Sequence, residues 1–316
     1  YKELAFMGFL EVAMNIRTIL KNIKLCKEDI KNYQPDVLVL VDYPGFNLRI
    51  AEFAKSIGIK VVYYISPQLW AWKEGRVETI KKYVEEMLVI LPFEKDFYKK
   101  HQVNAHFVGH PLLDAISDLA PIDAENFKKE NGLNDKEIIA LLPGSREQEV
   151  EKMLSLMLSV RDYFKNYQFV IAGAPSLPKE FYQKFVDDDV HFVSNKTYDL
   201  LRCSKAALVT SGTATLETAL LNIPEIVCYR TSTISYEIGK RVVKNIKFIS
   251  LVNLIMDREI VKELIQKELN TENLVNELQK ILEGQKRDKM LKNYELLREK
   301  LGGKGASEHA AEIIVN

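Results

Sequence analysis

The feature that most constrains this chain is a repeated alternation of short apolar runs with longer amphipathic stretches, which begins at Pro35. Short apolar runs bounded by turn residues are typical of buried strands, and helical spacing is typical of the stretches between them. Strands that alternate with helices form parallel sheets, so the sequence predicts an α/β fold. The expected strands are Val37–Val41, Lys60–Ile65, Met87–Leu91, Ala105–Val108, Ile138–Leu142, Phe169–Ala172, Val190–Val193, Ala206–Thr210 and Glu225–Cys228.

A lapse in this alternation divides the chain in two. The lapse is rich in Asp, Glu and Lys and contains Pro121 and Gly132, which is typical of a connection between domains. The expected organisation is an α/β domain over 1–115, a connection over 116–136, a second α/β domain over 137–285 and a helical tail over 286–316. After Asn253 the pattern predicts helices over 258–269, 272–282 and 287–301.

Composition and charge exclude several classes of protein. The 316 residues, of which 47% are hydrophobic and 28% are charged, suffice for two ordinary cores. Lys plus Arg and Asp plus Glu both number 44, so no net field attracts nucleic acid and any anion must be bound locally. The three cysteines are isolated in sequence, which predicts neither a zinc site nor a disulfide framework. No apolar run reaches the roughly 18 residues that cross a bilayer, and no segment resembles a cleavable signal.

Two loops that follow strands and open helices point to phosphate binding. In open α/β sheets, ligands bind outside the carboxyl ends of the strands. The loop at 142–146 directs free backbone N–H groups and a guanidinium at one point, and the loop at 210–215 adds hydroxyls to a glycine that lets an anion approach the backbone. Two such helix starts in one domain favour a diphosphate. The candidate groups belong to Gly144, Ser145, Arg146, Ser211, Gly212 and Thr213.

Glu217 lies one helical turn beyond Thr213, where its carboxylate can accept hydrogen bonds from a ribose diol. A nucleotide is therefore the ligand that these loops favour. The alternative is that Ser211 and Thr213 cap a helix and that Glu217 completes a capping box. Neither loop has the Walker A or the dinucleotide spacing, which disfavours ATP hydrolysis and NAD chemistry.

Polar and aromatic residues also follow the strands of the first half. Asp42 closes the first strand, and the turn after it leaves the carboxylate at the rim, where it acts as a general base or caps its own turn. Asn47, in the same turn, either contacts substrate or braces the loop. Trp70 and Trp72 share one loop, where they pack against a sugar or an acyl chain, or fill the space beneath the loop.

Four further polar residues follow later strands. His110 either faces the cleft or is structural. Tyr229 and Arg230 follow the strand that ends at Cys228, and Arg230 is the better candidate for a second cation on phosphate. Asn253 either contacts substrate or braces its loop. The other histidines lack the spacing of a metal site.

The segment Phe6–Leu20 is apolar on more than one helical face. Burial in the core is one interpretation. The other is a helix in the membrane interface, with Arg17, Lys21 and Lys24 meeting acidic headgroups. The residues expected to dock on the membrane are Phe9, Leu10, Val12, Ile16, Ile19 and Leu20.

Several motifs follow one another along the chain, namely Asp42–Asn47, Ser66–Trp72, Leu91–Glu94, Val108–His110, Leu141–Arg146, Ser211–Glu217 and Ser250–Asn253. This order is typical of lipid-A-disaccharide synthases, and the chain resembles that family over its whole length. The resemblance implies a GT-B fold, with two Rossmann-like domains facing across a cleft and UDP held by the second. It also implies a Gram-negative, cytoplasmic protein that is peripheral on the inner membrane and binds its anionic surface.

The resemblance implies an inverting transfer from UDP-2,3-diacylglucosamine to 2,3-diacylglucosamine 1-phosphate, which gives a β(1→6) disaccharide and UDP. No metal or other cofactor is expected, and a homodimer is left open. Asp42 is the base that the motif match implies. The residues expected to bind UDP are Gly144, Ser145, Arg146, Ser211, Gly212, Thr213, Glu217, Tyr229 and Arg230. The residues expected on the acceptor and acyl side are Asn47, Trp70, Trp72, His110 and Asn253.

One departure concerns the start of the chain. Members of the family begin with a strand and a Gly-Glu-Ala-Ser-Gly-Asp type of loop, which do not precede Tyr1. We therefore expect an incomplete first domain and reduced or absent activity until that segment is restored, and full turnover by the 316-residue chain would contradict this. A UDP-N-acetylglucosamine epimerase and an inactive sugar-nucleotide-binding module are the alternative functions, and product analysis separates the three.

Overall fold

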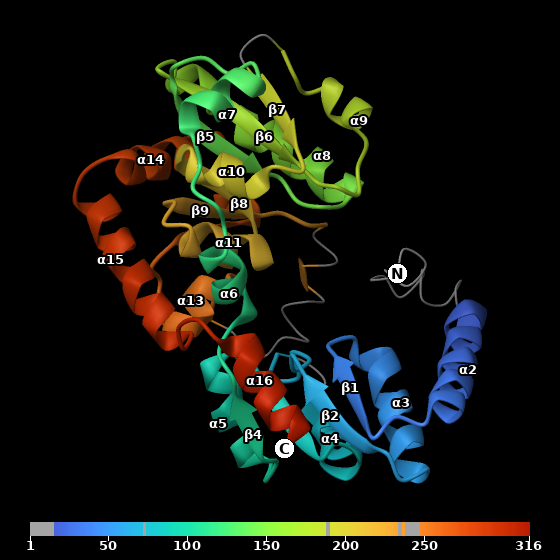
Figure 1. Ribbon diagram of the computed structural model, residues 1–316. Helices are drawn as coiled ribbons and strands as arrows, with labels where there is room; N and C mark the ends of the chain where they lie inside the picture. The colour runs from blue at the N-terminus through green and yellow to red at the C-terminus, as the bar shows by residue number, and fades with distance from the viewer. Residues whose placement is uncertain (1–15, 72–73, 188–189, 233–235, 238–246) are drawn as a thin grey trace. The chain divides into compact units, whose positions relative to one another are not determined.

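The computed structural model describes residues 16–71, 74–187, 190–232, 236–237 and 247–316. The chain forms two compact units, each built on its own sheet (Figure 1). The first unit comprises Tyr1–Pro111 together with Lys304–Asn316, and the second comprises Leu112–Gly303. Every pair of neighbouring strands in both sheets is parallel, which confirms the predicted α/β class.

The sheet of the first unit has four strands that pair in chain order, β1-β2-β3-β4. Runs of Val, Leu and Tyr form these strands because such side chains pack well on a pleated surface. The observed bounds lie within two residues of the expected ones. The strands are β1 (Val37–Val41), β2 (Lys60–Tyr64), β3 (Glu86–Val89) and β4 (Ala105–Phe107).

Helices cover both faces of this first sheet. The larger core contains Ile19, Tyr63 and Met87, and it joins one face of the sheet to the helix before the first strand and to the helices between the strands. Val62 points to the opposite face, where it packs with Leu88 and with Ala310 near the end of the chain. The helices are α2 (Ile16–Tyr33), α3 (Pro44–Ser56), the short η1 (Glu74–Arg76), α4 (Val77–Tyr83), α5 (Pro92–Lys100) and α16 (Ala306–Val315).

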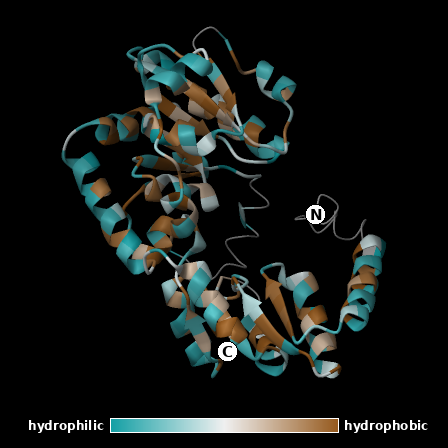
Figure 2. Ribbon diagram, in the orientation of Figure 1, coloured by the Kyte–Doolittle hydropathy of each residue, from teal (hydrophilic) through white to brown (hydrophobic). Residues whose placement is uncertain are grey.

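The second unit has a six-stranded sheet in the order β10-β9-β8-β5-β6-β7. Its strands are strongly hydrophobic, and helices with polar outer faces surround them (Figure 2). A parallel sheet buried on both faces requires such continuous apolar strands. The strands are β5 (Glu137–Leu142), β6 (Tyr167–Gly173), β7 (Val190–Ser194), β8 (Ser204–Thr210), β9 (Glu225–Tyr229) and β10 (Lys262–Ile265).

The helices of the second unit connect these strands and form its outer layers. Part of the expected connection is integrated in this unit, because Phe127 of α7 is buried in its core. Among the described residues, no helix combines the length and the apolar character that a membrane crossing requires. The helices are α6 (Pro111–Ser117), α7 (Ala124–Glu130), α8 (Glu147–Leu158), η2 (Arg161–Tyr163), α9 (Lys179–Gln183), α10 (Thr197–Arg202), α11 (Thr213–Leu220), α13 (Leu251–Met256), η3 (Gln266–Glu268), α14 (Thr271–Leu282) and α15 (Gln285–Lys300).

The prediction of a helix over 258–269 was wrong. The segment contains strand β10, which pairs in parallel with β9, and a short 3-10 turn follows it. Val261 and Leu264 are buried. Pairing with the sheet edge therefore overrides the helical spacing of this segment.

The residues expected to form one helical tail, 286–316, are divided between the two units. Helix α15 belongs to the second unit, whereas α16 belongs to the first. Gly302, Gly303 and Gly305 separate the two helices, and all three have positive φ values. The break therefore lies where the chain passes from one unit to the other.

The strand order places a topological switch point between β5 and β8. From β5 the chain continues outward through β6 and β7, and it then returns to β8 on the other side of β5. Leu142 at the end of β5 is in register with Val209 of β8, so the loops that follow these two strands leave the sheet side by side. In doubly wound sheets this is where ligands bind.

Candidate active site

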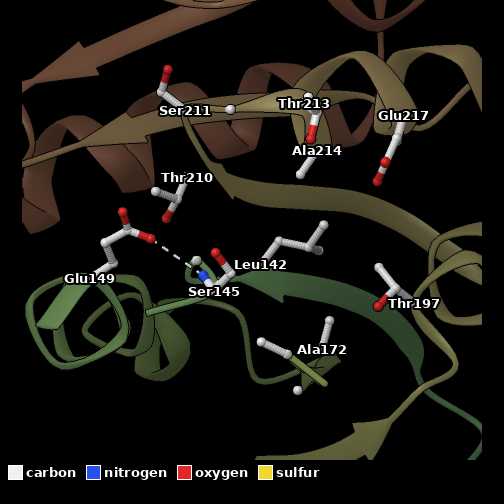
Figure 3. Close-up of a pocket in the computed structure, with 14 residues that line it drawn as sticks. Leu142, Ser145, Glu149, Ala172, Thr197, Thr210, Ser211, Thr213, Ala214 and Glu217 are labelled. Atoms are coloured by element: carbon white, nitrogen blue, oxygen red, sulfur yellow. Dashed lines mark hydrogen bonds between the residues drawn. The ribbon is translucent and has the colours of Figure 1, made fainter. Parts of the chain in front are cut away.

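A pocket of about 240 Å³ opens at the switch point of the second unit (Figure 3). Both predicted phosphate loops line it, one after β5 and the other after β8. The sequence-based expectation that these two helix starts converge therefore agrees with the geometry. The lining residues are Leu142, Gly144, Ser145, Glu149, Ala172, Gly173, Ala174, Thr197, Thr210, Ser211, Gly212, Thr213, Ala214 and Glu217.

The loop after β5 is closed by Glu149, a residue that the sequence analysis did not select. The Ser145 amide donates to Oε2 of Glu149 at 3.3 Å, and Nη1 of Arg146 donates to Oε1 at 2.8 Å. No side chain caps α8, which begins directly after Arg146. Glu149 therefore holds the amide and the guanidinium together at the edge of the pocket.

The loop after β8 presents the N-terminus of α11 to the pocket. Gly212 precedes the helix, and no side chain caps α11. Neither Ser211 nor Thr213 is thus the cap that the alternative interpretation required. The first N–H groups of a helix lack intrahelical acceptors and carry partial positive charge, so this end of α11 is suited to an anion.

Ser211 does not direct its hydroxyl into the pocket. The hydroxyl donates to the carbonyl of Ile249 at 3.0 Å, and the amide donates to the carbonyl of Cys228 at 3.2 Å. The Ser211 side chain points away from Ser145 on the opposite wall (Figure 3). Ser211 therefore fixes the loop, which corrects the expectation that its hydroxyl contacts phosphate.

Thr210 is a second pocket residue that the sequence analysis missed. Its hydroxyl is buried and has no hydrogen-bond partner among the described residues. A buried hydroxyl without a partner is costly, so its presence in the pocket wall favours contact with a polar ligand. The signal was available in the sequence, since Thr210 is the last residue of the strand that leads into the glycine loop.

Glu217 lines the pocket from the first turns of α11, and Tyr198 lies close to its carboxylate. Burial raises the pKa of Glu217, and burial together with this carboxylate raises the pKa of Tyr198 to about 12. Tyr198 therefore stays protonated, and the Glu217 carboxylate can accept hydrogen bonds from a hydroxyl-bearing ligand.

Arg146, Tyr229 and Arg230, which were expected to bind UDP, are not among the residues that line the pocket. Arg230 Nη2 donates to the carbonyls of Gln266 and Leu269, both at 3.2 Å. Arg230 therefore anchors the chain after β10, whereas the sequence analysis expected it on phosphate. Tyr229 is half-buried, and burial, followed by the nearby Glu149 carboxylate, raises its pKa.

In the first unit, Asp42 lies in an unusual turn directly after β1. Asp42 and Tyr43 have φ values of 46° and 43°, a left-handed conformation that costs roughly 1–2 kcal/mol for each non-glycine residue. Asn47 Nδ2 donates to the carbonyls of Val41 and Asp42, at 2.9 Å and 2.7 Å. The carboxylate-bearing residue is exposed. Asn47 thus braces the turn, and backbone strain of this kind is typical of functional sites.

The other residues expected on the acceptor side are mostly structural. Asn253 is fully buried, and its amide group bonds Ile260, Val261 and Glu263. His110 is buried, which lowers its pKa to about 4, so the ring is neutral at physiological pH. Trp70 packs edge-on against Phe93, with ring centroids 4.9 Å apart. Trp72 lies outside the described residues.

The expected membrane-docking residues divide into three groups. Phe9, Leu10 and Val12 lie outside the described residues, as does the side chain of Ile16, which begins α2. Ile19 is buried in the core of the first unit, which corrects its assignment to a docking surface. Leu20 is 53% exposed, and its assignment to the docking surface stays a prediction.

Comparison with known proteins gives consistent results. The family described as lipid-A-disaccharide synthetase matches residues 1–315. The lipid-A-disaccharide synthase of Myxococcus xanthus is 38% identical over 99% of this chain and 84% of its own length. That of Syntrophus aciditrophicus is 41% identical over 98% of this chain and 82% of its own length.

Solved structures with low sequence identity share the fold. The UDP-GlcNAc 2-epimerase of Neisseria meningitidis, solved with UDP-GlcNAc bound, has a TM-score of 0.64 at 14% identity and covers 98% of this chain and 82% of its own. The glycotransferase of kitacinnamycin has a TM-score of 0.64 at 10% identity, over 98% and 84% of the two chains. At such identity the likeness supports the two-unit GT-B fold alone. By family match and sequence identity along nearly its whole length, the chain belongs to the lipid-A-disaccharide synthetase family.

Proposed function

We propose that this chain is an inverting glycosyltransferase that joins UDP-2,3-diacylglucosamine to 2,3-diacylglucosamine 1-phosphate and releases UDP. The observation that carries the proposal is the pocket at the switch point, where two uncapped helix starts and Glu217 meet in a chain of this family. The second unit accordingly binds the nucleotide of the donor. The first unit supplies the base that acts on the acceptor.

The nucleotide's diphosphate is held by backbone N–H groups and Arg146. The two helix starts at the pocket supply N–H donors to the phosphate oxygens, and the Arg146 guanidinium, which pairs with Glu149 of the pocket wall, adds positive charge nearby. These groups stabilise the charge that collects on UDP as the glycosidic bond breaks. Glu217 accepts from the ribose hydroxyls, and Thr210 supplies a hydroxyl from the pocket wall.

Asp42 is the proposed general base. The acceptor hydroxyl attacks the anomeric carbon from the face opposite to UDP, and Asp42 takes the proton of that hydroxyl as the new bond forms. An exposed carboxylate on a strained, braced turn suits this role, because it meets an incoming substrate at a fixed position.

The test is a product assay with both diacylated substrates, run on the chain extended at its N-terminus by the segment whose restoration is expected to give full activity. This extended chain is the enzyme used in the activity measurements below. The enzyme is expected to form the disaccharide and UDP, and Asp42→Asn is expected to lower kcat by about a thousandfold because the proton then has no acceptor. The Kd for UDP, measured by calorimetry, is expected to stay within about twofold of the original. Retention of turnover by Asp42→Asn would exclude Asp42 as the base.

Two further measurements separate the alternatives. An epimerase would convert UDP-N-acetylglucosamine to its epimer, and an inactive module would bind UDP without any product. Glu217→Gln is expected to weaken UDP binding by about tenfold and 2′-deoxy-UDP binding by less, because the ribose loses a charged acceptor. Equal weakening of both ligands would contradict the proposed ribose contact.

We also propose that α2 binds an anionic membrane surface, where diacylated substrates reside. Arg17, Leu20, Lys21 and Lys24 follow the i, i+3, i+4, i+7 spacing of one helix face, and all four are exposed. Leu25, beside this face, is 54% exposed. An apolar strip next to cations is suited to acidic headgroups.

Sedimentation with vesicles tests this membrane contact. The pair Leu20→Ser and Leu25→Ser is expected to reduce binding to phosphatidylglycerol vesicles by about tenfold, because two apolar side chains no longer enter the interface. The matched control is Leu296→Ser, which removes a 45% exposed leucine from α15 in the other unit. Unchanged binding of the double variant would contradict the assignment of α2.

A further inference from the structure

The turn that carries Asp42 depends on a buried tyrosine from the neighbouring strand. Tyr63 lies on β2, and its hydroxyl donates to the carbonyl oxygen of Asp42. Asn47 donates to the same oxygen at 2.7 Å. On the other side, the Asp42 amide donates to the carbonyl of Tyr64 at 3.2 Å and continues the pairing of β1 with β2. Both peptide groups of Asp42 are therefore held.

The backbone needs this support. Two consecutive non-glycine residues, Asp42 and Tyr43, have positive φ, where side chains and backbone crowd each other. Pro44 follows and further restricts the backbone of Tyr43. Such a turn persists only where surrounding contacts outweigh its tendency to relax to the extended form.

The Tyr63 hydroxyl has no evident purpose in packing. Tyr63 is 0% exposed, and its ring belongs to the core of the first unit, where phenylalanine would fill nearly the same volume. Burying a hydroxyl in such a core costs free energy unless a hydrogen bond offsets it. Its described hydrogen bond is to the carbonyl of Asp42.

We propose that Tyr63 is a positioning residue for glycosyl transfer, whose hydroxyl holds the Asp42 backbone in the left-handed turn that presents the carboxylate to the acceptor. The inference rests on the proposed function of Asp42 as the general base. Tyr63 itself is buried and does not touch substrate. Its effect is on the rate of the chemical step, since a small displacement of a catalytic group lowers the rate strongly.

The test is Tyr63→Phe in the purified enzyme. We expect kcat to fall by about tenfold or more, while the KM for both substrates and the Kd for UDP stay within about twofold. The matched control is Tyr83→Phe, which removes another tyrosine hydrogen bond of the first unit, the one from its hydroxyl to Glu52 at 2.9 Å. This control is expected to leave kcat unchanged.

A rescue experiment separates positioning from a general loss of structure. Glycine adopts positive φ without strain, so Tyr43→Gly added to Tyr63→Phe is expected to restore kcat at least about threefold. Asn47→Ala removes the other donor to the Asp42 carbonyl, so it tests the need for a held turn without a change at Tyr63. It is expected to lower kcat as Tyr63→Phe does, with the acceptor KM unchanged.

The outcomes are distinguishable. The inference is overturned if Tyr63→Phe keeps kcat within about twofold, or if it changes KM and the Kd for UDP as much as kcat. Turnover by Asp42→Asn would instead show that Asp42 is not the general base, which contradicts the proposed function rather than the role of Tyr63 alone. If Tyr63→Phe does not fold, the Asn47→Ala arm decides, since an unchanged kcat there contradicts the need for a held turn.

Discussion

Glu94 is a buried carboxyl group beneath the loop that carries Trp70. It is 1% exposed and accepts a hydrogen bond from the Leu91 amide at 3.0 Å, which closes the start of α5. Ser66, at the beginning of the same loop, hydrogen-bonds Tyr98 at 2.8 Å. Burial raises the pKa of Glu94 to about 7, and the Leu91 amide opposes only part of that effect. Glu94 is therefore largely protonated in slightly acidic solution.

This carboxyl group predicts a pH-dependent stability. Because its pKa is raised on folding, the native state binds more protons between pH 4.5 and 7 than the unfolded chain, and the free energy of unfolding falls as pH rises. The loss amounts to about 3 kcal/mol across that range. Glu94→Gln cannot ionise, so urea denaturation at pH 5 and pH 8 is expected to show a smaller fall for this variant. The exposed Glu78→Gln on α4 serves as control, and an equal fall in both variants would contradict the prediction.

The loops of the site could be predicted from the sequence, but the contacts of several single residues could not. The loops around Gly144 and Gly212 were found because strand ends and glycines are local signals. The hydrogen bond of Ser211 to Ile249 and the closure by Glu149 depend on contacts that no local pattern encodes. Asn253 illustrates the same point, because its motif is visible but its burial is a property of the folded unit.

At the scale of elements, the loop from β5 to α8 is shaped by one glycine. Gly144 has a φ of +119°, outside the regions open to other residues. A Cβ there would lie 2.9 Å from Oε2 and 3.0 Å from Cβ of Glu149. The loop therefore accommodates both the turn and the Glu149 carboxylate only with glycine at this position.

Gly144→Ala is accordingly expected to weaken UDP binding. The substitution adds strain at a forbidden φ and displaces Glu149, which together cost more than about 1 kcal/mol and lower the affinity about tenfold. Gly132→Ala is the matched control, since Gly132 also has positive φ, +65°, but a Cβ there meets nothing within 4 Å. Calorimetry should show an altered Kd for the first variant alone. A normal Kd for Gly144→Ala would mean that the loop does not contact UDP.

At the scale of the whole molecule, the chain order does not match the order of the units. The first unit is completed by α16, which the chain reaches only after the second unit is finished. Helical spacing predicted that this end of the chain is helical, and parallel strands followed from the apolar runs. Helix α16 packs on the first sheet because of long-range contacts with Val62 and Leu88, which no local pattern shows. Strand β10 was not predicted because its pairing with β9 is also a long-range contact.

Because α16 belongs to the first unit, a destabilising substitution in this helix is expected to lower the stability of the first unit and not that of the second. Ala310 is 3% exposed and packs on Val62 and Leu88, so Ala310→Asp buries a carboxylate in an apolar contact and costs roughly 3 kcal/mol or more. The same substitution at the adjacent exposed Ala311 is the control. Hydrogen exchange should show lost protection in β2 and β3 but retained protection in β5 and β8, and UDP binding should persist because the pocket lies wholly in the second unit. Equal loss of protection in both sheets would mean that the two units unfold together.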